Sequence, residues 1–375
     1  MNLILIGIGI VLLLYIIRKQ YTKNWSTNLS VEIKLSQAEV YPGNEVILTE
    51  IITNGKWLPL PMLKVKFAID RSLIFSDMDI STKVSDKCYK SESFSILFYQ
   101  KITRKLPFVC SQRGYYPIDS IYVVSTDLLL DSLLATVIPT HECITVYPEP
   151  ISSDEVDIPY NRIMGTLLTK RYDYEDPFEF RGIREYQTYD TMKSINWNAS
   201  ARTGELKVNV HDYTASQEVC ILLNLEDEGI WKYDELKEKS ISMACSLAYR
   251  LTLQGIAVSM ISNGADKITG DHLYIQSGSD ESHRKTIILG LSRIDLGREM
   301  KEFAMMIDDN RRLLDKSAMV VMISTCRKEK LQLAYNQLVS EGAGGIWILP
   351  VHPGMDCECE KVDTDCVIKW EVLSE

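Results

Sequence analysis

One short polar segment concentrates the side chains that could carry chemistry. Residues 178–208 read FEFRGIREYQTYDTMKSINWNASARTGELKV. Its arginines are fork-shaped donors, and the Asp190 carboxylate can accept two of their hydrogen bonds. The Asn196 amide can satisfy backbone groups in a turn, and Trp197 supplies a large apolar ring with one N–H group. Residues of these types either recognise a charged partner or lock an irregular backbone in place.

The segment therefore has two interpretations. It is a recognition surface for another protein, or it is a structural lattice that holds the segment against the rest of its domain. Asn196 and Trp197 favour the lattice, because their types favour burial. Arginines are common at protein interfaces, so they fit either interpretation. The residues of the recognition surface would be Arg181, Arg184, Asp190 and Arg202.

Motifs of catalysis and phosphate binding are missing from the sequence. It contains no G-x-S-x-G and no G-x-x-x-x-G-K-[ST], and its five histidines show no triad or metal spacing. We therefore predict no catalytic residue, no cofactor and no enzymatic activity. The alternative is a hydrolase or other enzyme whose site forms only in the fold.

The order of residues in the polar segment resembles the signature of the domain-of-unknown-function fifty-eight family. The match runs through Arg181, Gly182, Arg184, Tyr186, Asp190, Asn196, Trp197, Ser200 and Arg202. The resemblance implies a von Willebrand factor A-like half, a preceding β-domain and an N-terminal hydrophobic segment. Family members typically accompany a MoxR-type AAA+ ATPase and are thought to act in assembling or activating other proteins. The chain departs from the family at Tyr189, where glycine is usual, and in showing one hydrophobic helix where many members begin with two.

The resemblance also raises the question of a metal. Von Willebrand A-like domains often hold Mg²⁺ through an Asp-x-Ser-x-Ser run after their first core strand. Here the corresponding residues are Asn224, Glu226 and Glu228, so the hydroxyl ligands are absent. We interpret this degenerate site as a solvated acidic loop and predict that it binds no metal.

A second metal hypothesis concerns the C-terminal run VHPGMDCECEKVDTDC. It offers a Cys₃His set of the kind that binds zinc, composed of His352, Cys357, Cys359 and Cys366. Zinc motifs generally place two to four residues between paired cysteines, and this spacing differs. An acidic loop is the favoured interpretation.

The elements around the polar segment fall into two groups. Residues 28–150 contain short alternating runs such as VEIKL, where Val31, Ile33 and Leu35 share one face. Proline, glycine and asparagine turns separate these runs, and no convincing helix interrupts them. We expect an all-β sandwich of immunoglobulin type.

Residues 160–375 change period. The apolar run VCILLNL, residues 219–225, has the length of a buried strand, and Ala244, Leu247 and Leu251 follow at helical spacing. Apolar strands then alternate with expected helices at 280–293, 299–314 and 328–341. This pattern predicts a Rossmann-like α/β domain with a mostly parallel sheet, which carries the polar segment.

The N-terminus begins with 16 uncharged residues, Asn2 to Ile17. In a helix they rise about 24 Å, a little less than the roughly 30 Å hydrocarbon thickness. We expect Arg18 to snorkel and Tyr21 and Trp25 to lie among headgroups, so residues 1–25 form a transmembrane anchor. The basic flank predicts a single-pass protein of the cell membrane with its bulk in the cytoplasm. The rival, a cleaved signal peptide, lacks a basic start and a cleavage site.

Charge and cysteine content complete the prediction. The chain has 41 basic and 51 acidic residues, a net charge of -10, so nucleic acid is not an expected partner. Nine scattered cysteines indicate reduced thiols rather than a disulfide framework. The family resemblance implies the partner and the role: we expect a non-enzymatic membrane-anchored protein that binds a MoxR-type ATPase in the maturation of a complex or envelope component. An outward-facing adhesion module is a further alternative, which the charge flank and the cysteines oppose.

Overall fold

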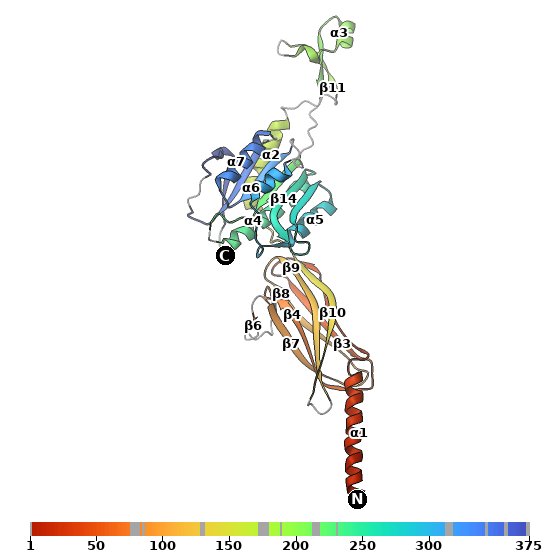
Figure 1. Cartoon of the computed structure of the whole chain (residues 1–375). Helices are drawn as coiled ribbons and strands as arrows, with labels where there is room; N and C mark the ends of the chain where they lie inside the picture. The colour runs from red at the N-terminus through yellow and green to blue at the C-terminus, as the bar shows by residue number, and fades with distance from the viewer. Residues whose placement is uncertain are drawn as a thin grey trace. The chain divides into compact units, whose positions relative to one another are not determined.

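The computed structural model describes residues 2–75, 83–84, 87–127, 132–171, 180–187, 190–211, 218–229, 232–311, 318–341, 344–355 and 359–372. The chain divides into two compact units, Met1–Glu149 and Pro150–Glu375 (Figure 1). The first unit is built from strands and one helix, and the second combines strands and helices.

Two sheets form the first unit. One has the order β1-β3-β8-β5 and is antiparallel, with strands β1 (Leu29–Leu35), β3 (Glu45–Asn54), β8 (Lys101–Cys110) and β5 (Leu73–Phe75). The other has the order β2-β10-β9-β4-β7-β6, with strands β2 (Glu39–Val40), β10 (Leu133–Val146), β9 (Gly114–Thr126), β4 (Leu60–Asp70), β7 (Lys87–Ile96) and β6 (Lys83–Val84). Its pairs are antiparallel except β2 with β10.

Alternation along the strands buries one face of each sheet. In β1, Val31 and Ile33 are buried between exposed neighbours, as the VEIKL pattern requires. In β4, Val65 and Phe67 are fully buried. Side chains from both sheets meet in a single apolar core, so the first unit is a two-sheet sandwich.

Helix α1 (Asn2–Asn24) precedes the sandwich, and the expectation that it crosses a membrane is wrong. In the part of the chain that the structure describes, no helix combines the length and apolarity that a bilayer span requires. The residues expected to extend the apolar run instead contact protein. Arg18 Nε lies 3.1 Å from the Asp127 carboxylate, and the buried Tyr21 hydroxyl donates to the carbonyl of Pro59 at 3.2 Å. The predictions of a transmembrane anchor in residues 1–25 and of a single-pass membrane protein are therefore both wrong.

The second unit contains a seven-stranded sheet. Its path is β15-β14-β13-β17-β18-β19, and β16 also pairs with β14. The strands are β13 (Glu218–Asn224), β14 (Ala257–Asp266), β15 (His272–Gly278), β16 (Ile294–Asp295), β17 (Met319–Ser324), β18 (Gly345–Val351) and β19 (Val367–Glu371). The central pairs are parallel, while β15 and β16 run antiparallel to β14, so the sheet is mixed.

Helices cover both faces of this sheet. Within β13, Ile221 and Leu223 pack on one face and Cys220 and Leu222 on the other, because successive side chains alternate. The first face is covered by α2 (Ser153–Arg171), α4 (Asp234–Leu253) and α5 (Glu281–Ser292). The second is covered by α6 (Phe303–Asn310) and α7 (Glu329–Glu341), and a short 3₁₀ turn, η3 (Thr364–Cys366), leads into β19.

The polar segment forms a small element group of its own, which we call the hairpin module (residues 180–211). Strands β11 (Phe180–Glu185) and β12 (Lys207–His211) make a separate two-stranded antiparallel sheet. Between them lie a 3₁₀ turn, η2 (Met192–Ser194), and helix α3 (Trp197–Thr203). The module is labelled by β11 and α3 in Figure 1.

Candidate functional site

The hairpin module is held by a bidentate ion pair. Arg184 donates from both terminal nitrogens to the two oxygens of Asp190, each at 2.6 Å. The backbone N–H of Gln187 donates to the same carboxylate at 2.7 Å. The hydrogen bonds from Arg184 hold the pKa of Asp190 below its ordinary value, with the Gln187 bond acting in the same direction. The pair therefore closes the loop between β11 and η2.

Asn196 is the second fixed point of the module. Its side-chain oxygen caps α3 by accepting from the N–H of Ala199 at 2.9 Å, and its amide donates to Asn209 at 2.7 Å. The Ser200 hydroxyl donates to the carbonyl of Asn196 and accepts from the backbone N–H of Lys207 at 2.9 Å. One amide and one hydroxyl thus join α3 to β12.

Glycines and backbone pairing define the ends of the module. Gly204 ends α3 in the left-handed conformation, with φ of 78°. Gly182 follows a register shift in the β11–β12 pair, and the N–H of Tyr186 donates to the carbonyl of Leu206 at 2.9 Å. The Arg181 side chain, Tyr189 and residues 178–179 lie outside what the structure describes.

The predicted burial of Trp197 is wrong. Its side chain is 63% exposed, and Met192, in the same module, is 70% exposed. Arg202, in the last turn of α3, is exposed as well. The structure therefore brings Arg184 to Asp190 and Asn196 to Ser200, and it leaves Trp197 and Arg202 facing solvent.

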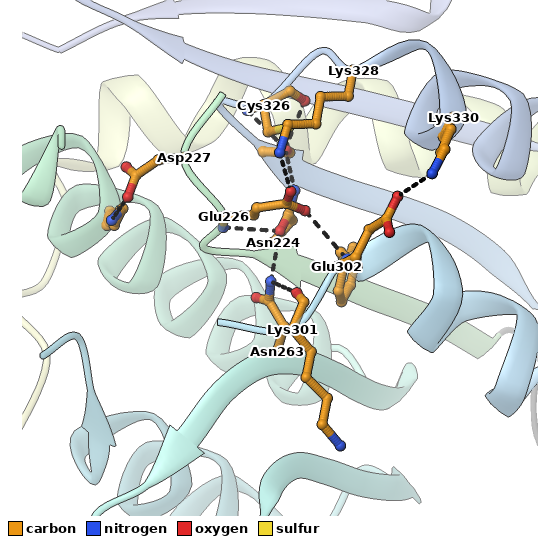
Figure 2. A network of polar contacts seen from close by, with 12 residues as sticks. Asn224, Glu226, Asp227, Asn263, Lys301, Glu302, Cys326, Lys328 and Lys330 are labelled. Atoms are coloured by element: carbon orange, nitrogen blue, oxygen red, sulfur yellow. Dashed lines mark hydrogen bonds and ion pairs between the residues drawn. The ribbon is translucent and has the colours of Figure 1, made fainter. Parts of the chain in front are cut away.

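The degenerate metal position lies at the carboxyl ends of β13 and β17, within a network of polar contacts (Figure 2). Asn224 donates to the Ser324 hydroxyl at 3.0 Å, and its side-chain oxygen accepts from Asn263 at 2.9 Å and from the N–H of Glu226 at 3.0 Å. Asn224, Asn263 and Ser324 are each at most 2% exposed. Buried amides and a hydroxyl therefore join the ends of three adjacent strands.

Each acidic residue of this loop has a basic partner from the chain itself. One oxygen of Glu226 accepts from the Lys328 ammonium, and the other accepts from the N–H of Phe303 at 3.2 Å. The other ion pairs are Asp227 with Lys237 at 2.7 Å, Glu228 with Arg327 at 2.7 Å and Glu302 with Lys330 at 3.1 Å.

The donor set does not suit a hard cation. Both Glu226 oxygens and the Asn224 oxygen are already hydrogen-bonded, and Glu228 faces a guanidinium. A metal ion would have to displace the Lys328 ammonium. The hydrogen bond to Glu226 raises the pKa of Lys328, so this ammonium keeps its charge.

Cys326 is the cysteine that contacts this network, through the Ser324 hydroxyl. It is fully buried, and desolvation raises the pKa of its thiol to about 11. The thiolate is the reactive form, so at neutral pH this cysteine is an inert thiol. Its N–H and carbonyl both bond to the Ser324 hydroxyl, at 3.1 and 3.0 Å, which gives it a structural place in the β17–α7 turn.

The proposed zinc set is only partly described. Cys357 lies outside the described residues, Cys359 is buried, and His352 packs its ring 5.8 Å from that of Tyr233. Within the described ranges, no three His, Cys, Asp or Glu residues are grouped so that they could hold a metal ion.

Solved structures that resemble the chain do so weakly. The CARDB domain of a Pyrococcus furiosus protein, in complex with di-metal ions, is 17% identical, with 32% of this chain and 91% of that chain covered and a TM-score of 0.20. Native α2-macroglobulin of Escherichia coli, from domain MG7 to the C-terminus, is 10% identical, with 33% and 24% covered and a TM-score of 0.24. Spo0M, a sporulation control protein of Bacillus subtilis, is 13% identical, with 43% and 58% covered and a TM-score of 0.19. Similarities this low do not indicate a shared fold.

No curated protein matches the chain. A family does match, and it covers both the hairpin module from Gly182 onward and the polar network. This confirms the resemblance drawn from the order of residues between Arg181 and Arg202. Residues 182–352 of the chain match the family described as protein of unknown function DUF58.

Proposed function

We propose that the chain is a non-enzymatic binding protein that acts beside a MoxR-type AAA+ ATPase in the assembly or maturation of another protein. The hairpin module is its docking surface for that ATPase. The partner follows from the family resemblance, in which the α/β unit corresponds to the von Willebrand A-like half.

The observation that carries the proposal is the exposed Trp197 on a locked scaffold. A tryptophan that is 63% exposed gains free energy when a partner buries it, and tryptophan and arginine are enriched among the residues that dominate binding. The Arg184–Asp190 pair and the Asn196 cap fix the backbone before it, and the Ser200 hydroxyl joins its helix to β12. A preorganised surface loses less conformational entropy on binding.

Other apolar side chains of the module share this exposure. Ile183 in β11 is 48% exposed and Leu206, just before β12, is 47% exposed. Together with Met192 they offer apolar area that a partner can cover. Arg202 supplies a charge in the last turn of α3, where it can pair with a partner carboxylate.

The polar network supports a binding role in a second way. Its carboxylates are engaged by lysine and arginine side chains, and its one cysteine is a buried thiol with a raised pKa. These groups suit a fixed, charge-balanced surface better than proton transfer or nucleophilic attack.

Affinity capture of the full-length chain from its own cells, with mass spectrometry of the co-purified proteins, tests the proposal. The expected partner is an AAA+ ATPase of MoxR type. It should be recovered with the wild-type chain and lost with Trp197→Ala, while it persists with Trp57→Ala, a change at a tryptophan of the first unit that is 70% exposed. Equal recovery with both variants would remove the hairpin module from the interface.

A further inference from the structure

A groove of about 370 Å³ lies between β15 and α6, apart from the hairpin module. Its lining includes His272 and Tyr274 from the strand, and Lys301, Met305, Met306 and Asp309 from the α6 segment. The volume is at the lower end of the range for ligand sites and suits one large side chain rather than a whole cofactor.

Buried side chains and hydrogen bonds fix both walls of the groove. Phe303 and Ile307 of α6 are buried under the helix, and the N–H of Phe303 donates to Glu226. On the strand side, Nδ1 of His272 lies 3.0 Å from the carbonyl oxygen of Asn263. Since that oxygen can only accept, Nδ1 donates the hydrogen bond. The groove is therefore preformed.

Strand β15 is the edge of the seven-stranded sheet. In the strand order it has β14 on one side and, among the described residues, no strand on the other. Leu273 and Ile275 are buried on one face of β15, and Tyr274 between them is 41% exposed toward the other. An open edge of this kind can pair with an added strand, whose side chains enter neighbouring pockets.

The charged side chains around the groove determine which charges a ligand would need. Glu302 pairs with Lys330, whereas Lys301 and Asp309 form no side-chain ion pair or hydrogen bond within the described residues. Figure 2 shows the Lys301 side chain pointing away from Glu226 and its network. Lys301 therefore offers an ammonium for a carboxylate of a ligand.

We propose that β15 and the groove bind an extended peptide segment of another protein, which pairs with the β15 edge and places a large apolar side chain between Tyr274 and Met305. An acidic residue of the peptide faces Lys301. This site is independent of the ATPase interface, so it stands or falls separately from the proposed function.

The groove is also connected to the polar network. The Asn263 amide donates to Asn224 and to the carbonyl of Lys301 at 3.1 Å, while the Asn263 carbonyl oxygen accepts from His272. One buried residue thus contacts both the strand wall and the loop that begins α6. Binding in the groove should therefore slow amide exchange at Asn263 as well as in β15.

The test uses fluorescein-labelled synthetic nonapeptides that alternate valine and threonine, with one central leucine, phenylalanine, methionine or tryptophan beside a glutamate. Fluorescence anisotropy measures their binding to the full-length chain, and a matched set carries proline at two backbone positions. We expect saturable binding of at least one peptide, weakened about tenfold or more by the prolines, with slowed amide exchange in β15.

Two variants test whether the peptide binds in the groove. Met305 is 59% exposed, so Met305→Glu should fold, and it should weaken binding about tenfold or more. Leu333→Glu, at a position of α7 that is 51% exposed, is the matched control and should leave binding unchanged. Equal affinity for Met305→Glu and wild type, unchanged exchange in β15, or absence of saturable binding with every peptide would overturn the proposal.

Discussion

The Lys328 ammonium is ion-paired with the Glu226 carboxylate at the carboxyl ends of β13 and β17. The Glu226 side chain is 13% exposed, and the Lys328 ammonium and the N–H of Phe303 contact its two oxygens. A lysine of the chain thus neutralises the carboxylate that the sequence comparison marked as a degenerate metal position. Two predictions follow from this relationship.

The first concerns stability. Lys328→Met leaves a mostly buried carboxylate with one hydrogen bond, and we expect the free energy of unfolding to fall by about 1–2 kcal/mol. Lys330→Met removes a lysine that is 72% exposed, and its effect should stay below about 0.5 kcal/mol. Urea unfolding of both variants measures the difference. Equal effects would show that Glu226 does not depend on Lys328.

The second concerns metal. Because the oxygens of Glu226 and Asn224 already accept hydrogen bonds, the wild-type chain should give no saturable heat when titrated with Mg²⁺ in a calorimeter. A saturable signal that disappears in Glu226→Ala would contradict the assignment of Lys328 as the resident cation.

A third prediction comes from Glu50 in the sandwich. The Glu50 carboxylate is 1% exposed, and neither of its oxygens has a hydrogen-bond partner within the described residues. Desolvation, followed by the charge of Glu92, raises its pKa to about 7, although Arg104 and Lys90 oppose the shift. The folded state then binds a proton that the unfolded state has already released.

This difference in proton binding sets the direction in which stability changes with pH. The stabilising contribution of Glu50 is fully present below about pH 4.5 and is lost as the pH rises to about 7. Glu50→Gln should therefore be more stable than the wild type at pH 8, by about 2–3 kcal/mol, and show little gain at pH 4.5. Urea unfolding across this range tests it, with Glu32→Gln, at an exposed position of β1, as the control. A gain that does not change with pH would contradict the shift.

A fourth prediction concerns backbone strain. Tyr99 has φ of 49°, so its backbone lies in the left-handed region, which is strained for a residue other than glycine. Its side chain is 71% exposed, so burial of the ring does little to offset this strain. Tyr99→Gly should raise the free energy of unfolding by about 0.5–1 kcal/mol, because glycine adopts this conformation freely. Phe98→Gly, at a neighbour that is 60% exposed, should instead lower it. Thermal unfolding of the two variants measures these changes. A lower free energy of unfolding for Tyr99→Gly than for the wild type would contradict the prediction of strain at Tyr99.

Several elements could be predicted from local pattern. The apolar run at 219–225 corresponds to β13 (Glu218–Asn224), because a continuous run of strand length suits a buried strand. Helix α7 begins at Glu329, one residue from its expected start, and α5 spans Glu281–Ser292 inside the expected 280–293. Burial on a regular period carries this information in the sequence.

Helix α2 was missed, although a signal existed. Val156, Tyr160, Ile163 and Leu167 follow helical spacing and pack on the core of the second unit. Pro159 lies inside the helix, and the sequence VYPEP just before it indicates a turn. A proline and a preceding turn are signals against a helix, so they mask the apolar stripe in the sequence.

The candidate site could be predicted only in part. The resemblance located Asn224 and Glu226, but no local pattern marks Lys328 or Asn263, because they meet Glu226 and Asn224 only when β13, β14 and β17 pair. The exposure of Trp197 was missed for a related reason. Residue type predicts burial only on average, and Trp197 is an exception with its side chain 63% exposed.

The prediction of a membrane-spanning helix was wrong because it relied on the residues that follow the apolar run. The 16-residue apolar run is short for a span, and the prediction relied on Arg18, Tyr21 and Trp25 to extend it. In the structure, Tyr21 and Trp25 are buried against the sandwich and Arg18 pairs with Asp127. Sequence alone does not tell an interfacial aromatic residue from one that packs on a protein.

The most direct measurement is the affinity of the purified full-length chain for the purified MoxR-type ATPase of the same organism, measured by fluorescence anisotropy with ATP and with ADP. We predict saturable binding that weakens about tenfold or more in Trp197→Ala and remains unchanged in Trp57→Ala. Absence of saturable binding in either nucleotide state, or equal affinities for the two variants, would contradict it.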